Sequence, residues 1–290
     1  MKSEVRTKAN PRPTETAAHR APARTALRTS VALLLAAGTT LHAQDAGEAS
    51  AADLAYRVQN RLAFIPRLPI ENQFDFGYGS EDAMRYAFRP RPVVPFSLGE
   101  NLSLITRTTF NLIYQEAPEA GLDDKFGLGD TDLEMYFSPK YTKAGGWIYG
   151  AGPMVRFPTA TDDALGGEKW GIGPAAAAMR QSGRWTYGVF MNHLWDFAGE
   201  DARADLNATY LQPVLSYTTT GATTFGVDTQ ATYDWTNEEW TVPINATVSQ
   251  LVKIGGQPIA FTLGGRYYAD SPAGGPEWGF QFSMNLLFAK

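Results

Sequence analysis

The chain has 290 residues, of which 44% are hydrophobic and 12% aromatic, enough for one large β domain or two small ones. It contains no cysteine, which excludes disulfide bonds and thiolate metal sites. The formal net charge is −5 at pH 7, and it becomes more negative once the N-terminal segment is set aside.

Residues 1–43 have the three parts of a secretory signal peptide. Three arginines between residues 20 and 28 precede the apolar run 31–38, and Leu41-His-Ala43 supplies small residues for cleavage, which we expect after Ala43. The apolar run is too short to be a membrane helix. Removal of this segment takes away seven basic and two acidic residues and leaves 18 basic and 28 acidic ones, a net charge of −10 that argues against a nucleic-acid partner.

The rest of the chain has no apolar run close to the roughly 20 residues that a spanning helix needs. If the mature protein lies in a membrane, it must therefore do so as a closed barrel, because only helices and closed barrels satisfy their backbone polar groups in lipid. The alternatives at this point are an outer-membrane barrel and a soluble periplasmic β protein.

Residues 44–69 form an N-terminal segment ahead of the barrel, either periplasmic or folded into the lumen as a plug. Within it, we expect one short helix from Ser50 to Ile65. Ser50 and Asp53 have capping-box spacing, and Pro66 ends the pattern. Apolar residues at helical spacing form one stripe, namely Leu54, Val58, Leu62 and Ile65.

Residues 70–290 predict an all-β fold, a transmembrane up-and-down antiparallel β-barrel of about twelve strands. The expected strands are 70–79, 83–97, 101–115, 128–140, 147–158, 170–181, 185–197, 205–218, 223–236, 239–252, 259–270 and 279–290. Twelve is even, as in bacterial barrels, and short glycine turns alternate with mostly longer loops. With the N-terminus in the periplasm, the short turns fall on the periplasmic side.

The last strand shows the alternation most clearly. Phe280, Phe282, Met284, Leu286 and Phe288 share one parity, and small polar residues occupy the other. Because a strand sends alternate side chains to opposite faces, one face is wholly apolar, as expected for a strand that faces lipid.

A repeat of 38 residues, the length of one hairpin, supports the barrel. Four glycines that each follow an apolar residue recur at this spacing, namely Gly150, Gly188, Gly226 and Gly264. We expect them on the lumen face near the periplasmic turns. They either leave room for the N-terminal segment as a plug or let the strands bend and coil.

Four prolines fall inside expected strands, namely Pro153, Pro174, Pro213 and Pro243. Proline removes a ladder hydrogen bond, so these positions imply bulges or shifted strand boundaries.

Several phrases of the sequence resemble a family of bacterial outer-membrane barrels labelled transporters or MetA-pathway-of-phenol-degradation proteins, some of which are mislabelled neuromedin U. The phrases are Phe74-Asp-Phe-Gly-Tyr-Gly79, Val94-Pro-Phe-Ser-Leu98, Ile113-Tyr-Gln-Glu116, Gly127-Leu-Gly-Asp130, Phe137-Ser-Pro-Lys140, Phe157-Pro-Thr-Ala-Thr-Asp162 and Tyr233-Asp-Trp235. The resemblance implies an outer-membrane barrel that passes small apolar or aromatic compounds. It supplies no catalytic residue, and we expect no cofactor and no metal.

The candidate functional residues are those whose parity points into the lumen. Arginines on the second and third strands and carboxylates on the fourth either sort permeating solutes or simply pair across the wall, Arg107 with Glu134. Three inward aromatics offer a stacking surface. The candidates are Arg85, Arg89, Arg91, Arg107, Asp130, Asp132, Glu134, Tyr136, Phe190 and Tyr268.

The sequence favours a channel for small solutes in contact with outer-membrane lipid, and it leaves the solute and the oligomeric state open. The alternatives are a structural or adhesive barrel, for which the loops are short, a soluble periplasmic binding protein, and an outer-membrane hydrolase. The hydrolase would rest on His193, the only histidine after the signal peptide. Because His193 shares the outward parity of Met191 and Trp195, we favour an interface role for it over a catalytic one.

Overall fold

The computed structural model describes residues 50–141 and 145–288, so the expected signal peptide lies outside the described residues. The helix α1 (Ala51–Gln59) begins at Ser50, whose Oγ accepts a hydrogen bond from the backbone N–H of Asp53 at 3.0 Å. The helix is shorter than expected, because the side chain of Asn60 accepts from the N–H of Leu62 at 2.9 Å and turns the chain there. The four residues of the apolar stripe are all buried.

The described strands form a single antiparallel sheet. They are β1 (Arg67–Tyr78), β2 (Ala83–Pro90), β3 (Val93–Leu98), β4 (Leu102–Thr109), β5 (Leu112–Gln115), β6 (Lys125–Leu128), β7 (Thr131–Pro139), β8 (Trp147–Phe157), β9 (Lys169–Ser182), β10 (Trp185–Gly199), β11 (Asn207–Thr218), β12 (Thr223–Thr229), β13 (Ala231–Asp234), β14 (Glu239–Ile254), β15 (Gln257–Asp270) and β16 (Trp278–Leu287). Four strands are interrupted, so β2 with β3, β4 with β5, β6 with β7 and β12 with β13 each trace one strand. The twelve expected strands are therefore confirmed.

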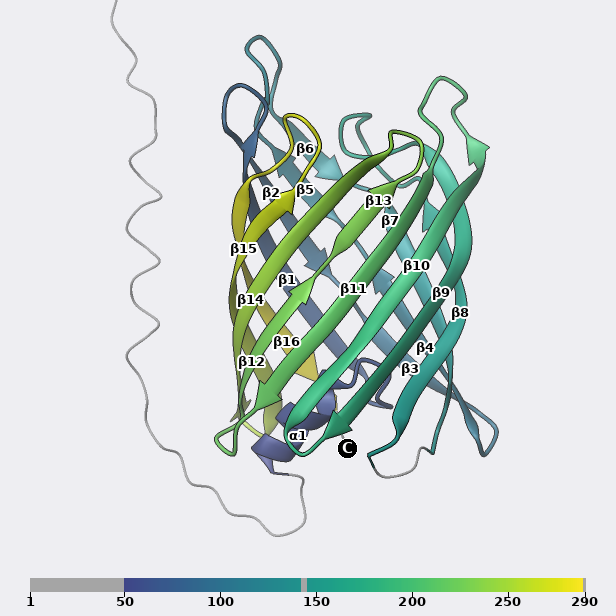
Figure 1. The fold of residues 1–290 in the computed structure, drawn as a ribbon, viewed down its shortest axis with the longest axis vertical. Helices are drawn as coiled ribbons and strands as arrows, with labels where there is room; N and C mark the ends of the chain where they lie inside the picture. Colours follow the sequence, from purple (N-terminus) through teal and green to yellow (C-terminus); the bar gives the residue numbers. More distant parts are fainter. Residues whose placement is uncertain (1–49, 142–144, 289–290) are drawn as a thin grey trace, which may run out of the picture. The chain divides into compact units, whose positions relative to one another are not determined.

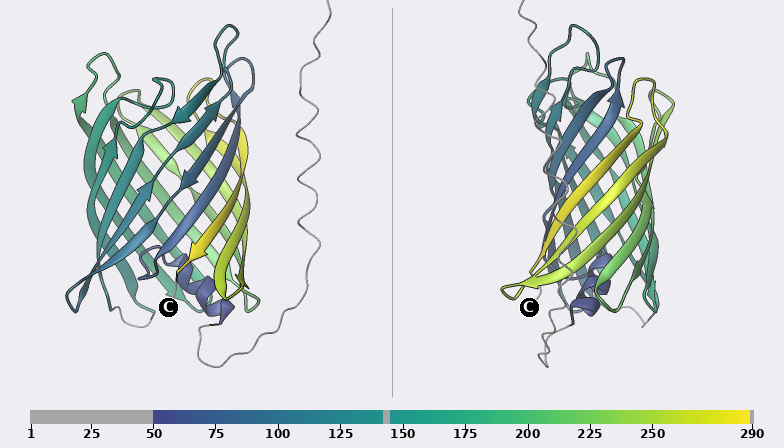
Figure 2. Two further views of the ribbon diagram at one scale, coloured as in Figure 1. Left: turned by 180° about the vertical axis from the view of Figure 1, so that it is seen from behind. Right: turned by 90° about the vertical axis from the view of Figure 1, so that its left-hand side faces the viewer.

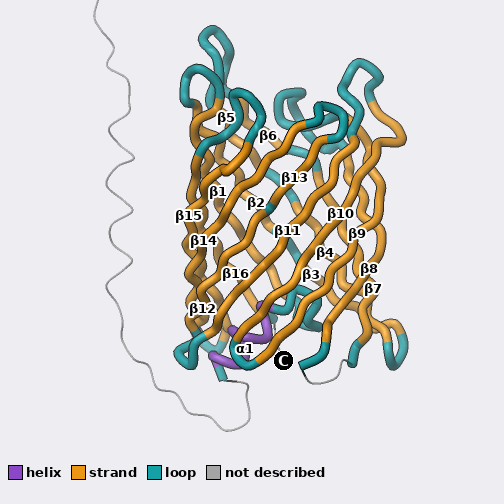
Figure 3. The backbone as a smooth tube through the Cα atoms, in the orientation of Figure 1, coloured by secondary structure: helices purple, strands orange, loops and turns teal. Residues whose placement is uncertain are grey.

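The sheet closes on itself because β1 pairs with β16, from Arg67 opposite Leu287 to Phe76 opposite Trp278. Successive strands run up and down around the wall (Figure 1), and the view from behind shows the same pattern in the half of the wall formed by β1 to β7 (Figure 2). The helix α1 lies at the end with the short turns, and it packs against β11, β12 and β14 (Figure 3). The predicted up-and-down barrel is thus confirmed. Within the described residues, no helix is long and apolar enough to cross a membrane.

Side chains alternate between the two faces of the wall as the sequence predicts. On β14, Ile244 is 46% exposed on the outside, whereas its neighbour Asn245 is fully buried inside. Exposed aromatic residues gather at both ends of the outer face, with Trp147, Trp185 and Phe225 near the short turns and Trp170, Trp195, Trp235, Trp240 and Trp278 near the longer loops. The outer face is therefore apolar with aromatic ends, and the inner face is polar.

The four strand prolines lie inside continuous strands, so the expected boundaries hold there. Pro153 and Pro174 face each other across β8 and β9. Of the four, only Pro243 lies at a shift of register, between Val242 and Pro243 on β14. The expected bulge is therefore present at one of the four prolines, and the other three lie where the register does not shift.

Three of the strand breaks lie side by side in the wall. The break between β2 and β3 contains Pro92, which cannot donate a backbone hydrogen bond. At this level Phe110 donates to the carbonyl of Pro90 at 3.2 Å, and Gly129 donates to the carbonyl of Asn111 at 2.9 Å. Breaks of this kind re-aim side chains, and Asn111 and Asp130, which lie in two of them, point into the lumen.

Candidate functional site

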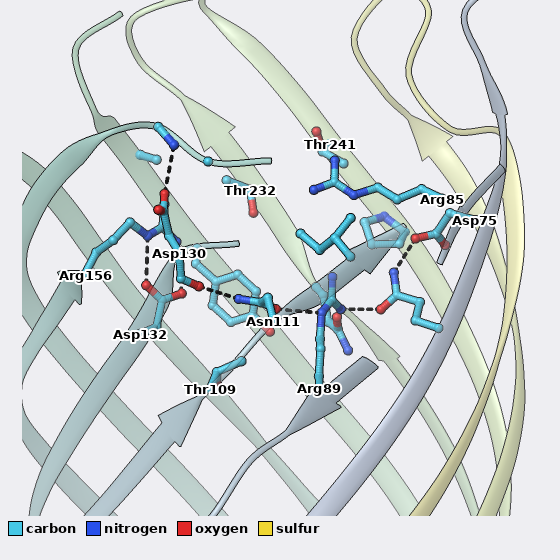
Figure 4. Close-up of a pocket in the computed structure, with 18 of the residues that line it drawn as sticks. Asp75, Arg85, Arg89, Thr109, Asn111, Asp130, Asp132, Arg156, Thr232 and Thr241 are labelled. Atoms are coloured by element: carbon cyan, nitrogen blue, oxygen red, sulfur yellow. Dashed lines mark hydrogen bonds and ion pairs between the residues drawn. The ribbon is translucent and has the colours of Figure 1, made fainter. Parts of the chain in front are cut away.

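The lumen contains a cavity of about 690 Å³ on the side of the longer loops. Its wall carries side chains from nearly every strand, and loop residues such as Gly167 and Pro272 border its mouth. Figure 4 shows polar and charged side chains converging on this space from opposite sides of the barrel. The candidate site is therefore the lumen itself.

The predicted partners Arg107 and Glu134 face each other on β4 and β7 and form an ion pair. Glu134 is 3% exposed, and its Oε1 also accepts from the hydroxyl of Tyr136 and the side-chain amide of Asn192, both at 3.2 Å. This carboxylate is therefore saturated with donors from three neighbours, as a buried charge requires.

The other two predicted carboxylates have different partners. Asp132 forms a two-pronged pair with Arg156 on β8, with N–O distances of 2.8 and 3.0 Å. Asp130 instead accepts from the backbone N–H groups of Gly167 at 2.8 Å and Ala160 at 3.4 Å. Asp130 thus holds the loop between β8 and β9 against the wall and is engaged by backbone rather than by a lumen cation.

Arginines outnumber carboxylates on the wall formed by β1 and its neighbours. Glu71 on β1 forms ion pairs with two of them, with Arg89 at 3.5 Å and with Arg91 at 3.1 Å. Arg89 also donates to Asn111 at 3.1 Å, and Asn111 in turn donates to the carbonyl of Asp130 at 2.6 Å. A chain of hydrogen bonds thus crosses from the basic wall to the acidic one (Figure 4).

The remaining predicted lumen residues lie as expected on the inner face. Arg85 and Tyr268 line the cavity described above, and Phe190 and Tyr136 are buried lower in the barrel. Sequence reasoning did not single out six charged residues of the lumen, namely Arg61, Arg67, Glu71, Asp75, Arg156 and Arg266.

Below the ion pair, two smaller cavities of about 230 and 170 Å³ continue toward α1. Arg91 borders the upper cavity and both of these. From the N-terminal segment, Arg61 reaches up and donates to Gln212 at 2.6 Å, and its guanidinium lies 4.9 Å from the ring centre of Phe190. The segment therefore occupies the lower lumen and is anchored there by an arginine.

The four repeated glycines lie against different neighbouring residues. A Cβ atom added at Gly226 or Gly264 would lie 2.7 or 2.8 Å from the side chain of Thr247, and at Gly188 it would strike the adjacent strand. At Gly150 it would meet the carbonyl oxygen of Phe137 on the adjacent strand at 3.2 Å and Leu62 of the N-terminal segment at 3.3 Å. Neighbouring strands therefore limit the space at all four glycines, and the segment adds a contact at one of them.

His193 lies on the outer face, where its Nδ1 is 2.7 Å from the hydroxyl of Thr209 and its ring is 4.1 Å from that of Trp195. The same hydroxyl accepts a hydrogen bond from the indole of Trp235 at 2.8 Å. This arrangement fits an aromatic cluster near the rim of the barrel, which is the role that we favoured from the sequence.

Two of the longer loops, 116–124 between β5 and β6 and 158–168 between β8 and β9, carry several acidic residues, and local hydrogen bonds hold some of their carboxylates. The N–H of Ala164 and the ammonium of Lys125 donate to Asp162, each at 3.0 Å, and they lower its pKa. Donation from the N–H of Ala117 at 2.9 Å and from Tyr114 similarly lowers the pKa of Asp124. In residues 50–141 and 145–288, no group of three or more carboxylate or imidazole side chains is placed to hold a metal ion.

No protein-family model matches the chain, and no curated protein matches it in sequence. Among solved structures, an outer-membrane channel from Pseudomonas putida F1 matches 78% of this chain and 95% of its own with a TM-score of 0.59 at 16% identity. Outer-membrane phospholipase A from Escherichia coli matches 81% and 98% with a TM-score of 0.44 at 12% identity. The β domain of the Bordetella autotransporter BrkA matches 78% and 100% with a TM-score of 0.42 at 10% identity.

At such low identity, the likeness to the Pseudomonas channel shows a shared fold, a closed antiparallel barrel. The resemblance expected from the short sequence phrases is thus supported at the coarser level of the barrel and not at the level of the phenol-degradation family.

Proposed function

We propose that the chain is an outer-membrane channel for small solutes. The observation that carries this proposal is the combination of an apolar, aromatic-ended outer face with a polar lumen that holds a cavity of about 690 Å³. Eight-stranded barrels are filled by their own side chains and sixteen-stranded ones hold an open channel, so twelve strands suit a passage of intermediate width. The exposed aromatics suit the two interfaces of a bilayer.

The charges of the lumen favour anions. Six arginines line the main cavity, namely Arg85, Arg89, Arg91, Arg107, Arg156 and Arg266, against four carboxylates, namely Asp75, Asp130, Asp132 and Glu134. An excess of positive charge along a narrow passage favours anions over cations. The resemblance implied apolar or aromatic solutes, whereas this lining suits a charged solute, for which the ring of Tyr268 still offers a stacking surface.

The N-terminal segment, residues 50–66, acts in this proposal as a plug that narrows the periplasmic end. Leu54 and Val58 are buried in an apolar cluster that includes Ala222 and Leu251 of the barrel. Arg61 adds the hydrogen bond to Gln212. Leu62 is buried in a second cluster with Ile105 and Phe190, and the side chain of Gln181 donates to the carbonyl of Tyr56 at 2.7 Å. These contacts are fewer than those that hold a strand in the wall, so in this proposal the segment leaves without unfolding the barrel.

Uptake into proteoliposomes tests the channel and its charge preference together. We expect radiolabelled pyruvate to enter liposomes that contain the protein several-fold faster than choline, a permanent cation, at pH 7. Liposomes without protein are the control. Faster entry of choline would contradict the anion preference, and entry of neither solute above the control, also after deletion of residues 50–66, would contradict the channel.

A structural or adhesive barrel and an outer-membrane hydrolase remain the competing functions. The observation relevant to the hydrolase is the contact of His193 with Thr209 on the outer face. That hydroxyl is shared with Trp235, and the contact lies outside the lumen, so it adds no support to catalysis.

A further inference from the structure

One row of inward positions crosses four adjacent strands on the basic side of the lumen. Arg85 on β2 is opposite Asp75 on β1, Asp75 is opposite Gly279 on β16, and Gly279 is opposite Arg266 on β15. A Cβ atom at Gly279 would lie 2.4 Å from the carbonyl oxygen of Phe74 and 2.5 Å from Oδ1 of Asp75. Glycine therefore leaves the space through which Arg266 reaches across β16 toward Asp75.

Arg266 is buried without enough partners. Its side chain is 4% exposed, and its Nε lies 3.5 Å from Oδ1 of Asp75, too long for a strong hydrogen bond. Among the described residues, neither Nε nor Nη1 of Arg266 has a hydrogen-bond partner, and neither has Oδ1 of Asp75. Buried charged donors without partners are costly, so their presence in a cavity wall points to a group that satisfies them when it binds.

Arg85 supplies a second positive charge to the same cavity. Its guanidinium points into the open space in Figure 4, and no ion pair joins it to any described residue. The row thus sets two guanidinium groups, those of Arg85 and Arg266, against the single carboxylate of Asp75. It carries one uncompensated positive charge.

We propose that Arg85 and Arg266 bind the carboxylate group of a small monocarboxylate inside the lumen. A guanidinium matches the planar, two-oxygen geometry of a carboxylate, and Nη1 of Arg266 has no hydrogen-bond partner among the described residues. A single negative charge neutralises the row itself, whereas phosphate at pH 7 is partly a dianion, and that form would bring a second negative charge beside Asp75. This proposal names a solute class for the anion channel proposed above. The passage of the solute rests on that channel, whereas the binding of the solute does not.

Binding to the purified, folded protein in detergent tests this site without any need for conduction. The probes are benzoate, benzamide as a neutral analogue of the same shape, and phosphate, each titrated by calorimetry at pH 7. We expect saturable binding of benzoate, with benzamide and phosphate at least about tenfold weaker, because the charge-assisted hydrogen bonds are lost or mismatched.

Two variants locate the site. Arg85→Gln removes the free charge, and Arg266→Lys keeps the charge but loses the guanidinium fork, so each is expected to weaken benzoate binding about tenfold. Arg57→Gln, on the exposed face of α1, removes the same charge far from the row and is expected to leave binding unchanged. Heat-modifiable gel mobility checks that each variant is folded.

Equal binding of benzoate and benzamide, or benzoate binding that survives both Arg85→Gln and Arg266→Lys in folded protein, would overturn the site. Tighter binding of phosphate would overturn the monocarboxylate assignment. Solute uptake without benzoate binding refutes this site and leaves the channel standing, whereas benzoate binding without uptake refutes the channel and leaves the site standing.

Discussion

Replacement of Arg107 by methionine is expected to lower the free energy of unfolding by about 3 kcal/mol, because it leaves Glu134 buried without its counter-charge. Glu134 is 3% exposed, and Tyr136 and Asn192 would still donate to it. These two remaining hydrogen bonds place the expected loss near the lower end of the range for broken buried pairs. Urea unfolding in lipid vesicles measures it.

The double variant Arg107→Met with Glu134→Met serves as the control. Because it removes both charges, it should recover most of the stability that the single variant loses. A single variant as stable as the wild type would show that water in the lumen already screens the pair. The pairing would then contribute nothing measurable.

Replacement of Ile244 by arginine is expected to lower the free energy of unfolding by about 2 to 4 kcal/mol, the cost of a cation at the midplane of a bilayer. Ile244 is 46% exposed on the outer face near the middle of β14. The matched control is Ile254→Arg, on the same face at the end of the same strand, where the cost falls to about 0 to 1 kcal/mol. Equal effects at the two positions would contradict a membrane-spanning β14.

Much of the fold was predictable from the sequence because alternate residues of a strand face opposite sides of the wall. The position of a residue in its strand therefore indicates whether its side chain points into the lumen or outward. Asn192 and Asn245 lie inside, and Trp195 and Ile244 outside, as their positions require. The same signal was available for Glu71 and Asp75, which alternate with Phe74 and Phe76 on β1, and for Arg266, which shares the parity of Tyr268. These inward charges were therefore predictable and were missed.

The pairing of those charges was not predictable from one sequence. The row from Arg85 to Arg266 passes through the closure between β1 and β16, strands that are about 200 residues apart in the chain. Nor does parity show that Asp130, in a break of its strand, is bonded to the backbone of a loop instead of an arginine. Such partners depend on register and on irregular backbone, which three-dimensional packing decides.

The helix and the glycines show the same limit. The stripe from Leu54 to Ile65 marks the buried residues correctly, but the helix ends at Gln59 because one side chain, that of Asn60, captures a backbone N–H. The glycine period marks inward positions, yet a shared neighbour, Thr247, explains two of the four. Periodicity identifies a face, whereas the reason for a residue on that face lies in its contacts.

Single-channel recording in planar bilayers tests the channel most directly. The wild-type protein and a variant that lacks residues 50–66 are compared in a potassium chloride gradient. We expect stepwise conductance that is larger in the variant and selective for chloride in both, with the chloride preference increased by Glu134→Gln, which removes a negative charge from the lumen. Bilayers that stay silent after many insertions of both proteins, with insertion verified by heat-modifiable mobility of the recovered protein, would contradict a conducting lumen.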